Sequence, residues 1–147
     1  TAIEEGVENS RAIWEGESTL EGRAIALSME VPDDLPSILA TESDLIDIVI
    51  DLVKNANEAL PKGGSIWISA KSVGKFVRLT VQDDGIGMDS ETLRRATSPF
   101  FTTKRDVGSG LGLSTIEGLV ETWGGKLDLA STPGNGTTVL VDFPTAD

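Results

Sequence analysis

Five acidic or amide side chains recur every three or four residues after Thr41. Helical geometry places positions at this spacing on one side of a helix, so we expect a polar stripe. Its members are Asp44, Asp47, Asp51, Asn55 and Glu58. A divalent cation would relieve the repulsion among the four carboxylates, and oxygen ligands of this kind suit Mg²⁺. Taken alone, such a stripe is usually a solvated helix face, and the segment by itself favours that interpretation.

A further carboxylate stands at the end of an alternating run. Apolar residues occupy every second position from Val77 to Val81, and Asp83 is in phase with them. A carboxylate at the edge of a core must find a hydrogen-bond donor or take up a proton, because burial disfavours its charge. The alternative is that Asp83 already belongs to a turn, since Asp-Asp-Gly is favourable turn chemistry. The run alone leaves the two interpretations equal.

Glycines gather in two places after this carboxylate. Gly85 and Gly87 follow Asp83 directly, and a second group precedes an expected helix. The second group consists of Gly108, Gly110 and Gly112. Glycine lets backbone amides approach phosphate oxygens, and a helix N-terminus adds a favourable dipole. The spacing is not that of a P-loop, and it is not a persuasive dinucleotide fingerprint because the second group follows an irregular segment. A flexible loop explains either group on its own.

The hydrophobic pattern indicates helices and strands in mixed order. Strands are expected at 24–31, 65–71, 75–83, 126–131 and 137–143, and helices at 1–20, from Thr41 to about Leu60, and at 111–123. Gly6 and Gly16 weaken the first helix. Residues 84 to about 108 show no sustained period, and a loop of that length is usually functional or disordered. We expect an α+β two-layer sandwich, with one mixed sheet of about five strands and helices on one face.

The second of these helices is the clearest. Thr41 followed by Asp44 is a capping box with Asp in place of the usual Glu or Gln. A core-facing stripe then runs through Leu45, Val49, Leu52, Val53, Ala56 and Leu60. We expect Pro61 and the glycines at 63 and 64 to end this helix.

The composition excludes several classes of site. The chain of 147 residues contains no histidine and no cysteine, which excludes histidine general bases, His- or thiolate-ligated metals and disulfides. Its formal charge of −12 disfavours a nucleic-acid partner, because such a surface repels phosphate backbones. A bound anion would therefore need backbone amides, a few placed cations or a divalent metal.

The length and hydropathy indicate a single domain, 1–147, without direct membrane contact. Hydrophobic residues make up 39% of the chain, enough for one core. No apolar run is long enough to span a membrane and no leader opens the sequence, so we expect neither a membrane span nor a signal peptide. The absence of cysteine favours a reducing compartment, and we expect a cytoplasmic location, with or without a membrane anchor in a longer protein.

Taken in chain order, the chemistry-bearing segments resemble the catalytic and ATP-binding domain of sensor histidine kinases. That family is related to gyrase-type, heat-shock chaperone and mismatch-repair ATPases. The segments look like its N, G1, F, G2 and G3 boxes, which are Asn55–Ala59, Asp83–Gly87, Pro99–Lys104, Gly108–Leu113 and Gly134–Thr138. The resemblance is strong from Leu35 to Phe143, and the Pro-Phe-Phe-Thr-Thr-Lys run points to the kinase branch.

The resemblance implies a Bergerat-type ATP-binding fold with a long ATP lid at about 88–107, and it implies ATP and Mg²⁺ as cofactors. Asn55 would coordinate the Mg²⁺, Asp83 would accept a hydrogen bond from the adenine amino group, and Lys104 would neutralise phosphate charge. Pro99, Phe100 and Phe101 would anchor the lid. The other expected nucleotide contacts are Glu58, Ala59, Gly85, Ile86, Gly87, Thr102, Thr103, Gly108, Gly110, Leu111, Gly112, Leu113 and Thr137.

Three positions depart from the family pattern. Asp51 stands where histidine kinases usually carry Asn or His, whereas the gyrase and chaperone branches carry an acidic residue that activates water. We therefore hypothesise that Asp51 lies near the γ-phosphate as a partner of the metal or as a base. Thr97 and Ser98 stand where Phe and Glu are common, which would alter lid docking.

The function implied by the resemblance is one half of a histidine kinase. The domain would bind Mg-ATP and give the γ-phosphate to a histidine on another domain, because the chain has no histidine of its own. Its partners would be the dimerisation and histidine-phosphotransfer domain of the same kinase and a downstream response regulator. Two alternatives stay open: an ATPase of the same fold that uses water, and a non-catalytic nucleotide-binding or docking module.

Overall fold

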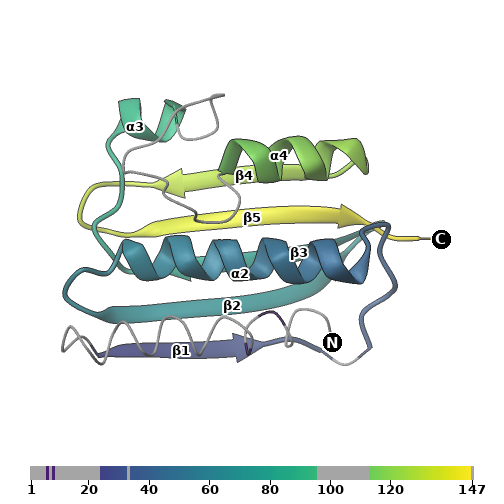
Figure 1. Ribbon diagram of the computed structural model, residues 1–147, viewed down its shortest axis with the longest axis horizontal. Coiled ribbons are helices and arrows are strands. Elements are labelled where there is room, and N and C mark those ends of the chain that lie inside the picture. The colour runs from purple at the N-terminus through teal and green to yellow at the C-terminus, as the bar shows by residue number, and fades with distance from the viewer. Residues whose placement is uncertain (1–5, 7, 9–23, 33, 96–112, 147) are drawn as a thin grey trace.

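A mixed sheet of five strands, in the order β1-β2-β3-β5-β4, forms one layer of the molecule (Figure 1). The computed structural model describes residues 6, 8, 24–32, 34–95 and 113–146. The strands are β1 (Ile25–Glu30), β2 (Gly64–Val73), β3 (Phe76–Asp83), β4 (Lys126–Ser131) and β5 (Thr137–Pro144). Strand β1 is parallel to β2, and the other pairs are antiparallel. The expected mixed sheet is confirmed.

Helices α2 (Glu42–Glu58) and α4 (Leu113–Thr122) cover one face of this sheet (Figure 1). The inner faces of the strands alternate with their outer faces, so that every second residue is buried against the helices. Helix α4 contributes Ile116 and Val120, both fully buried. Burial of each such side chain stabilises the fold by roughly 1.5–3 kcal/mol. The α+β two-layer sandwich expected from the sequence is therefore the observed architecture.

Helix α2 begins where the capping signature places it. The side chain of Thr41 accepts a hydrogen bond from the backbone N–H of Asp44 at 3.1 Å. Glu42 and Asp44 lie in the first turn, where carboxylates interact favourably with the helix dipole. The six residues of the expected stripe are all buried: Leu45, Val49, Leu52, Val53, Ala56 and Leu60. The helix ends at Glu58, three residues before Pro61, and Leu60 reaches the core from just beyond it.

Gly6 has a packing role that the sequence pattern does not reveal. It is helical and buried, and a Cβ added there would lie 2.8 Å from the Cβ of Val49 on α2. The glycine that weakens helix propensity is therefore what permits the backbone at position 6 to approach α2 closely. Apart from Gly6 and the helical Glu8, the expectation of a helix over residues 1–20 lies outside the described residues.

A short helix, α3 (Ser90–Arg95), interrupts the segment that was expected to be irregular. Asp89 caps it, because its side chain accepts a hydrogen bond from the backbone N–H of Thr92 at 2.7 Å. Six residues are too few to produce a helical hydrophobic period. The expectation of irregular chain from 84 onward is therefore wrong over this stretch.

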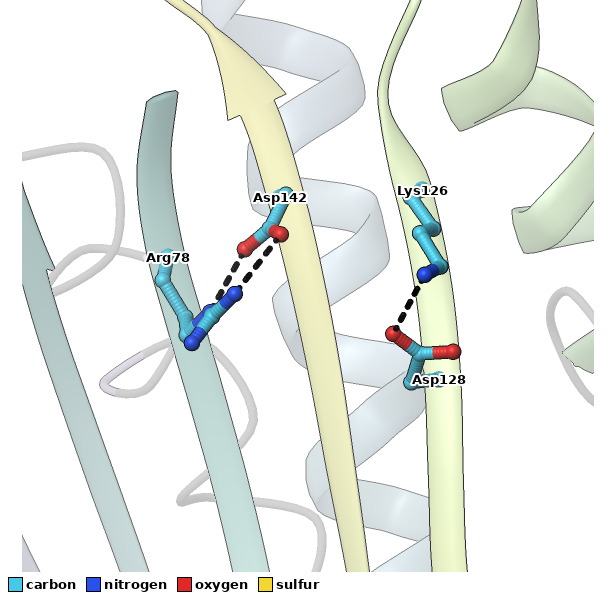
Figure 2. A network of polar contacts seen from close by, with 4 residues as sticks. All are labelled: Arg78, Lys126, Asp128 and Asp142. Carbon is cyan, nitrogen blue, oxygen red and sulfur yellow. Dashed lines mark hydrogen bonds and ion pairs between the residues drawn. The ribbon is translucent and has the colours of Figure 1, made fainter. Parts of the chain in front are cut away.

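The face of the sheet away from the helices is mostly polar, although Trp67 and Phe76 are exposed on it, and it carries its own ion pairs (Figure 2). Arg78 on β3 and Asp142 on β5 are directly opposite in register, and their fork-like contact joins Nε to Oδ1 at 2.8 Å and Nη2 to Oδ2 at 3.1 Å. Lys126 and Asp128, both on β4, form a looser pair at 3.4 Å. The candidate functional site lies instead on the opposite face, at one end of the sheet.

Candidate functional site

The last row of side chains on the helix-facing side of the sheet is polar on β3, β5 and β4, whereas β2 contributes the buried Ile66 opposite Asp83. Register places Asp83 of β3 opposite Thr137 of β5, and Thr137 opposite Ser131 of β4. The next row inward is apolar throughout and consists of Ile68, Val81, Val139 and Leu129. In Figure 1 this end of the sheet lies at the left, beside the C-terminal end of α2 and the segment that leads to α3. A carboxylate and two hydroxyls thus line the end of the core.

Asp83 is inside the sheet, which decides between its two interpretations. It is the last residue of β3 and only 5% exposed, so it is not a turn residue already outside the ladder. Its Oδ1 accepts a hydrogen bond from the backbone N–H of Gly85 at 2.9 Å. Burial raises the pKa of Asp83, the backbone N–H groups of Gly85 and Thr137 oppose that rise, and the charge of Asp84 adds to it.

The carboxylate of Asp83 keeps acceptor capacity for a ligand. Its hydrogen-bond partners within the described part of the chain are backbone groups, at Gly85 and Thr137. An ionised carboxylate offers about four lone-pair sites, so these donors do not exhaust it. A buried carboxylate in this state gains most from a further donor that excludes water. The residue therefore fits recognition of a ligand N–H or O–H group.

Three chain segments cross next to Asp83, and backbone hydrogen bonds lock them together. The N–H of Ile86 donates to the carbonyl of Ala59 at 3.0 Å, just after α2. The carbonyl of Ile86 accepts from the N–H of Gly134 at 2.8 Å, in the turn between β4 and β5. The ends of α2, β3 and β4 therefore form one unit around the expected G1 segment.

The glycines of this crossing are required by the protein's own packing. A Cβ added at Gly85 would overlap the carbonyl oxygen of Ala59, and one added at Gly87 would overlap that of Thr132. Gly87 also has φ +69°, which L side chains rarely adopt. The sequence indicated that these glycines let the backbone approach phosphates or a base. The structure gives a second reason, which is the close approach of neighbouring carbonyls.

Sequence reasoning missed Ser131, which joins three of these segments. Its Oγ lies 2.8 Å from the backbone nitrogen of Met88, 2.9 Å from the carbonyl oxygen of Gly136 and 2.8 Å from Oγ1 of Thr137. The signal was available, because Ser131 is in phase with Leu127 and Leu129, as Asp83 is with its own strand. A polar residue that ends an inward-facing apolar series marks the end of a core.

Asp84 was also missed, and it has a structural role. Its Oδ1 accepts a hydrogen bond from the backbone N–H of Ser65 at 2.8 Å, across the start of β2. This contact ties the residue after β3 to the neighbouring strand. Asp84 therefore helps to hold Asp83 in place, and it also contributes the negative charge that raises the pKa of Asp83.

The polar stripe of α2 is not uniformly solvated. Asp47 and Glu58 are exposed, Asp44 and Asn55 are half-buried, and Asp51 is buried with 7% of its surface exposed. The interpretation of the stripe as a solvated face is therefore wrong at Asp51. Asn55 lies one turn before Ala59, whose N–H approaches the carbonyl of Asn55 at 3.2 Å. The helix thus carries Asn55 toward the crossing of the three segments.

The donor set fits a magnesium ion held mainly by a nucleotide. Within the described residues, no three acidic side chains gather closely enough to hold a metal by themselves. Mg²⁺ characteristically takes one or two protein oxygens and completes its shell with phosphates and water. Asn55 is half-buried, and its amide oxygen can supply one such ligand.

The remaining expected contacts divide into two groups. Ala59 and Leu113 are half-buried near helix ends, and Ile86 is 60% exposed beside Asp83. The other residues of the expected lid and second glycine group lie outside the described residues: Pro99, Phe100, Phe101, Thr102, Thr103, Lys104, Gly108, Gly110, Leu111 and Gly112. Among the expected residues, the structure thus sets Ile86 against Ala59, just after α2, and Asp83 beside Thr137.

No helix among the described residues has both the length and the apolar character needed to cross a bilayer.

Comparisons with known proteins identify the family. Residues 40–147 match the family described as Histidine kinase-, DNA gyrase B-, and HSP90-like ATPase. Sensor histidine kinase ZraS of Escherichia coli (strain K12) is 35% identical over 122 residues, which cover 83% of this chain and 26% of ZraS. The chain spans about a quarter or less of the length of the first curated relatives it matches.

Solved structures agree with the sequence comparison. The catalytic domain of histidine kinase ThkA superposes with a TM-score of 0.79 at 27% identity, over 99% of this chain and 93% of that domain. ThkA has also been solved in complex with response regulator protein TrrA, where the TM-score is 0.73 at 26% identity, over 97% of this chain and 40% of that one. Full-length ShkA in complex with AMPPNP gives 0.77 at 26% identity, over 98% of this chain and 30% of ShkA. The chain therefore belongs to the histidine kinase-, DNA gyrase B- and HSP90-like ATPase family, as a catalytic and ATP-binding domain of the sensor histidine kinase type.

Proposed function

We propose that the domain binds Mg-ATP at the polar end of its sheet and gives the γ-phosphate to a histidine on a separate domain. The observation that carries this proposal is the buried carboxylate of Asp83, held by backbone N–H groups and still able to accept a further hydrogen bond. The adenine amino group is a donor that fits this position. That ShkA was solved in complex with AMPPNP supports nucleotide binding by this chain.

The base would lie between Asp83 and the crossing of the three segments. Asp83 would accept from its amino group, while Ala59, Ile86 and Leu113 would contribute apolar surface. Ile86 is 60% exposed, which is unusual for a large aliphatic side chain, and a bound base would cover it. The residues would thus orient the base and exclude water from the carboxylate.

The phosphates would extend from there toward α2. Asn55 would hold the Mg²⁺, which neutralises charge on the phosphates when bound. Lys104 and the backbone N–H groups at Gly108, Gly110 and Gly112 would contact the phosphates, with residues 88–107 closing as the lid. Because phosphoryl transfer depends mainly on positioning and electrostatic stabilisation, this domain needs no nucleophile of its own.

The acceptor would come from the dimerisation and histidine-phosphotransfer domain of the same kinase, since this chain has no histidine. The phosphorylated histidine would then supply a response regulator, as the complex of ThkA with TrrA suggests by analogy. We place the domain in the cytoplasm, in keeping with its lack of cysteine and its use of ATP.

The direct test is transfer of label from [γ-³²P]ATP. The chain is mixed with the separately made histidine-bearing dimerisation domain of its full-length kinase, and label on that partner is followed over time. We expect acid-labile, base-stable label on the partner, lost in Asn55→Ala and kept in Ser69→Ala, a control on the outer face of β2. ATP binding without any transfer to the partner contradicts the kinase assignment.

A water-using ATPase is the second candidate, and the burial of Asp51 favours it. The carboxylate lies one helical turn before Asn55, with 7% of its surface exposed, in the position where related hydrolases carry an activating acid. Phosphate release by the purified chain distinguishes the two functions. If Asp51 is a base for water, Asp51→Asn reduces phosphate release by about 100-fold or more and leaves ATP affinity nearly unchanged.

A further inference from the structure

The hydroxyl of Ser131 has every hydrogen-bonding position in use. A serine hydroxyl has one proton to donate and two lone pairs that accept. The backbone N–H of Met88 can only donate, so it donates to Oγ of Ser131 and occupies one lone pair of that oxygen. Two oxygens remain around Ser131, the carbonyl of Gly136 and the hydroxyl of Thr137. One of these two oxygens receives the proton of Ser131, and the other faces its remaining lone pair. This choice decides whether the hydroxyl of Thr137 donates or accepts toward a ligand.

Gly136 fixes the direction of the Ser131 proton. A carbonyl oxygen can only accept, and Gly136 is buried, so its carbonyl gains the full value of a hydrogen bond that water does not replace. Ser131 donates to it at 2.9 Å. The proton of Ser131 is then committed, and the contact at 2.8 Å between the two hydroxyls must use the proton of Thr137.

Thr137 is left as an acceptor toward the nucleotide. Its hydroxyl proton is spent on Ser131, so only lone pairs face the space beside Asp83. Asp83 lies directly opposite Thr137 in the β3–β5 ladder, where neighbouring Cβ atoms are about 5 Å apart. The row therefore presents two adjacent acceptors and no side-chain donor of its own.

We infer that Ser131 is a positioning residue that holds the Thr137 hydroxyl in its accepting orientation, so that Thr137 and Asp83 together select a purine with an amino group at C6. An exocyclic amino group has two N–H donors and matches two acceptors. A carbonyl at the same place meets two acceptors and is rejected. This inference rests on the proposed binding of ATP and concerns how that site chooses its base.

The test compares ATP with ITP, which carries a carbonyl at C6. Dissociation constants with Mg²⁺ are measured by calorimetry for the unaltered chain and for Ser131→Ala, Ser131→Thr and Thr137→Val. The control is Thr138→Val, the same residue type at the next position, which faces the other side of β5. The N1–H of ITP can donate to Asp83 in every variant. The contribution of that hydrogen bond to ITP affinity therefore largely cancels when variants are compared.

We expect the unaltered chain to prefer ATP by about tenfold or more. Ser131→Ala releases the Thr137 proton for donation, so the preference for ATP over ITP narrows by about threefold or more, because ITP gains a donor while the Thr137 hydroxyl is no longer held as an acceptor for ATP. Ser131→Thr keeps the hydroxyl and therefore the preference for ATP over ITP. Thr138→Val also leaves that preference unchanged. Thr137→Val weakens ATP more than ITP, because ATP alone uses the acceptor.

Equal weakening of ATP and ITP by Ser131→Ala, with the preference unchanged, overturns the inference and leaves Ser131 with a structural role only. If the Ser131→Ala variant does not fold, Thr137→Val decides alone. A larger preference for ATP over ITP in Thr137→Val means that Thr137 donates a hydrogen bond, which also overturns the inference. A chain that binds no ATP at all refutes the proposed function instead, so the two failures are distinguishable.

Discussion

At the scale of the residue, the burial of Asp83 has a measurable consequence for stability. Its pKa in the folded chain is raised, chiefly by burial. A carboxyl group with a raised folded pKa holds its proton longer in the folded state, so stability falls as pH rises from the unfolded pKa, about 3.9, through the folded value. Above this pH range the buried, ionised carboxylate lowers the free energy of unfolding when no ligand is bound.

Asp83→Asn should therefore raise the thermal midpoint of the nucleotide-free domain at neutral pH. The amide keeps an oxygen that can accept from Gly85 and carries no charge. This rise in the thermal midpoint should shrink and vanish as the pH falls below the pKa of Asp83 in the unfolded chain. Thermal unfolding at several pH values measures it, with Asp128→Asn on the outer face of β4 as the control. A lower midpoint for Asp83→Asn at neutral pH contradicts the account.

The sequence could suggest Asp83 but could not decide its state. Phase with Val77 and Val81 placed it on the inner side of a strand, whereas the turn interpretation was equally compatible with local chemistry. The role of Ser131 could not be predicted for a different reason, since its partner Met88 is 43 residues away in the chain. Hydrogen bonds between distant segments leave no local pattern, so only the end of an apolar series hinted at it.

At the scale of the element, the cap of α2 is a local feature with a predictable energy. Thr41→Ala removes the acceptor for the N–H of Asp44 and should lower the free energy of unfolding by about 1 kcal/mol. Urea denaturation measures the change. Ser43→Ala, an exposed substitution in the same first turn, should be close to neutral. Equal effects of the two substitutions would mean that the cap does not stabilise the helix.

Alanine substitutions at two glycines distinguish destabilisation by backbone strain from destabilisation by steric overlap. Gly74 has φ +61° with nothing within 4 Å of an added Cβ, so Gly74→Ala should destabilise by about 1 kcal/mol through strain alone. Gly87 has φ +69° and an added Cβ would also overlap the carbonyl oxygen of Thr132, so Gly87→Ala should cost at least about 2 kcal/mol. The same urea titration compares them, and equal costs would refute the packing role of Gly87.

Elements with a sustained period were predictable, and elements defined by tertiary contact were not. Helix α2 and the strands show the hydrophobic repeats that mark them, so their positions agree to within a few residues. Helix α3 has only six residues, and its capping Asp89 was its sole local signal. The packing of Gly6 on Val49 and of Gly85 on Ala59 depends on partners that the local sequence does not name.

At the scale of the whole molecule, the sequence indicated one mixed sheet but not its order. Antiparallel hairpins β2-β3 and β4-β5 follow from short turns, whereas the insertion of β5 between β3 and β4 requires contacts across half the chain. The same order creates the polar row, because it sets Asp83 beside Thr137 and Thr137 beside Ser131. The candidate site is thus a product of topology as much as of motif.

The charge of −12 should make stability depend on salt. Carboxylates repel one another across the surface, and added NaCl screens that repulsion, so the thermal midpoint at neutral pH should rise with salt. The comparison condition is a pH near the isoelectric point of about 4.3, where the net charge is small and the salt effect should be much weaker. A midpoint that falls with salt at neutral pH would show that favourable ion pairs outweigh the repulsion.

The most direct test of the account is calorimetric titration of the chain with ATP in the presence of Mg²⁺. We predict a saturable heat for ATP, a much weaker one for GTP, and at least about a tenfold loss of ATP affinity in Asp83→Asn, because the carboxylate would no longer receive the adenine amino group. Absence of binding, or an Asp83→Asn variant that binds ATP as well as the unaltered chain does, would contradict the assignment of the polar row as the adenine site.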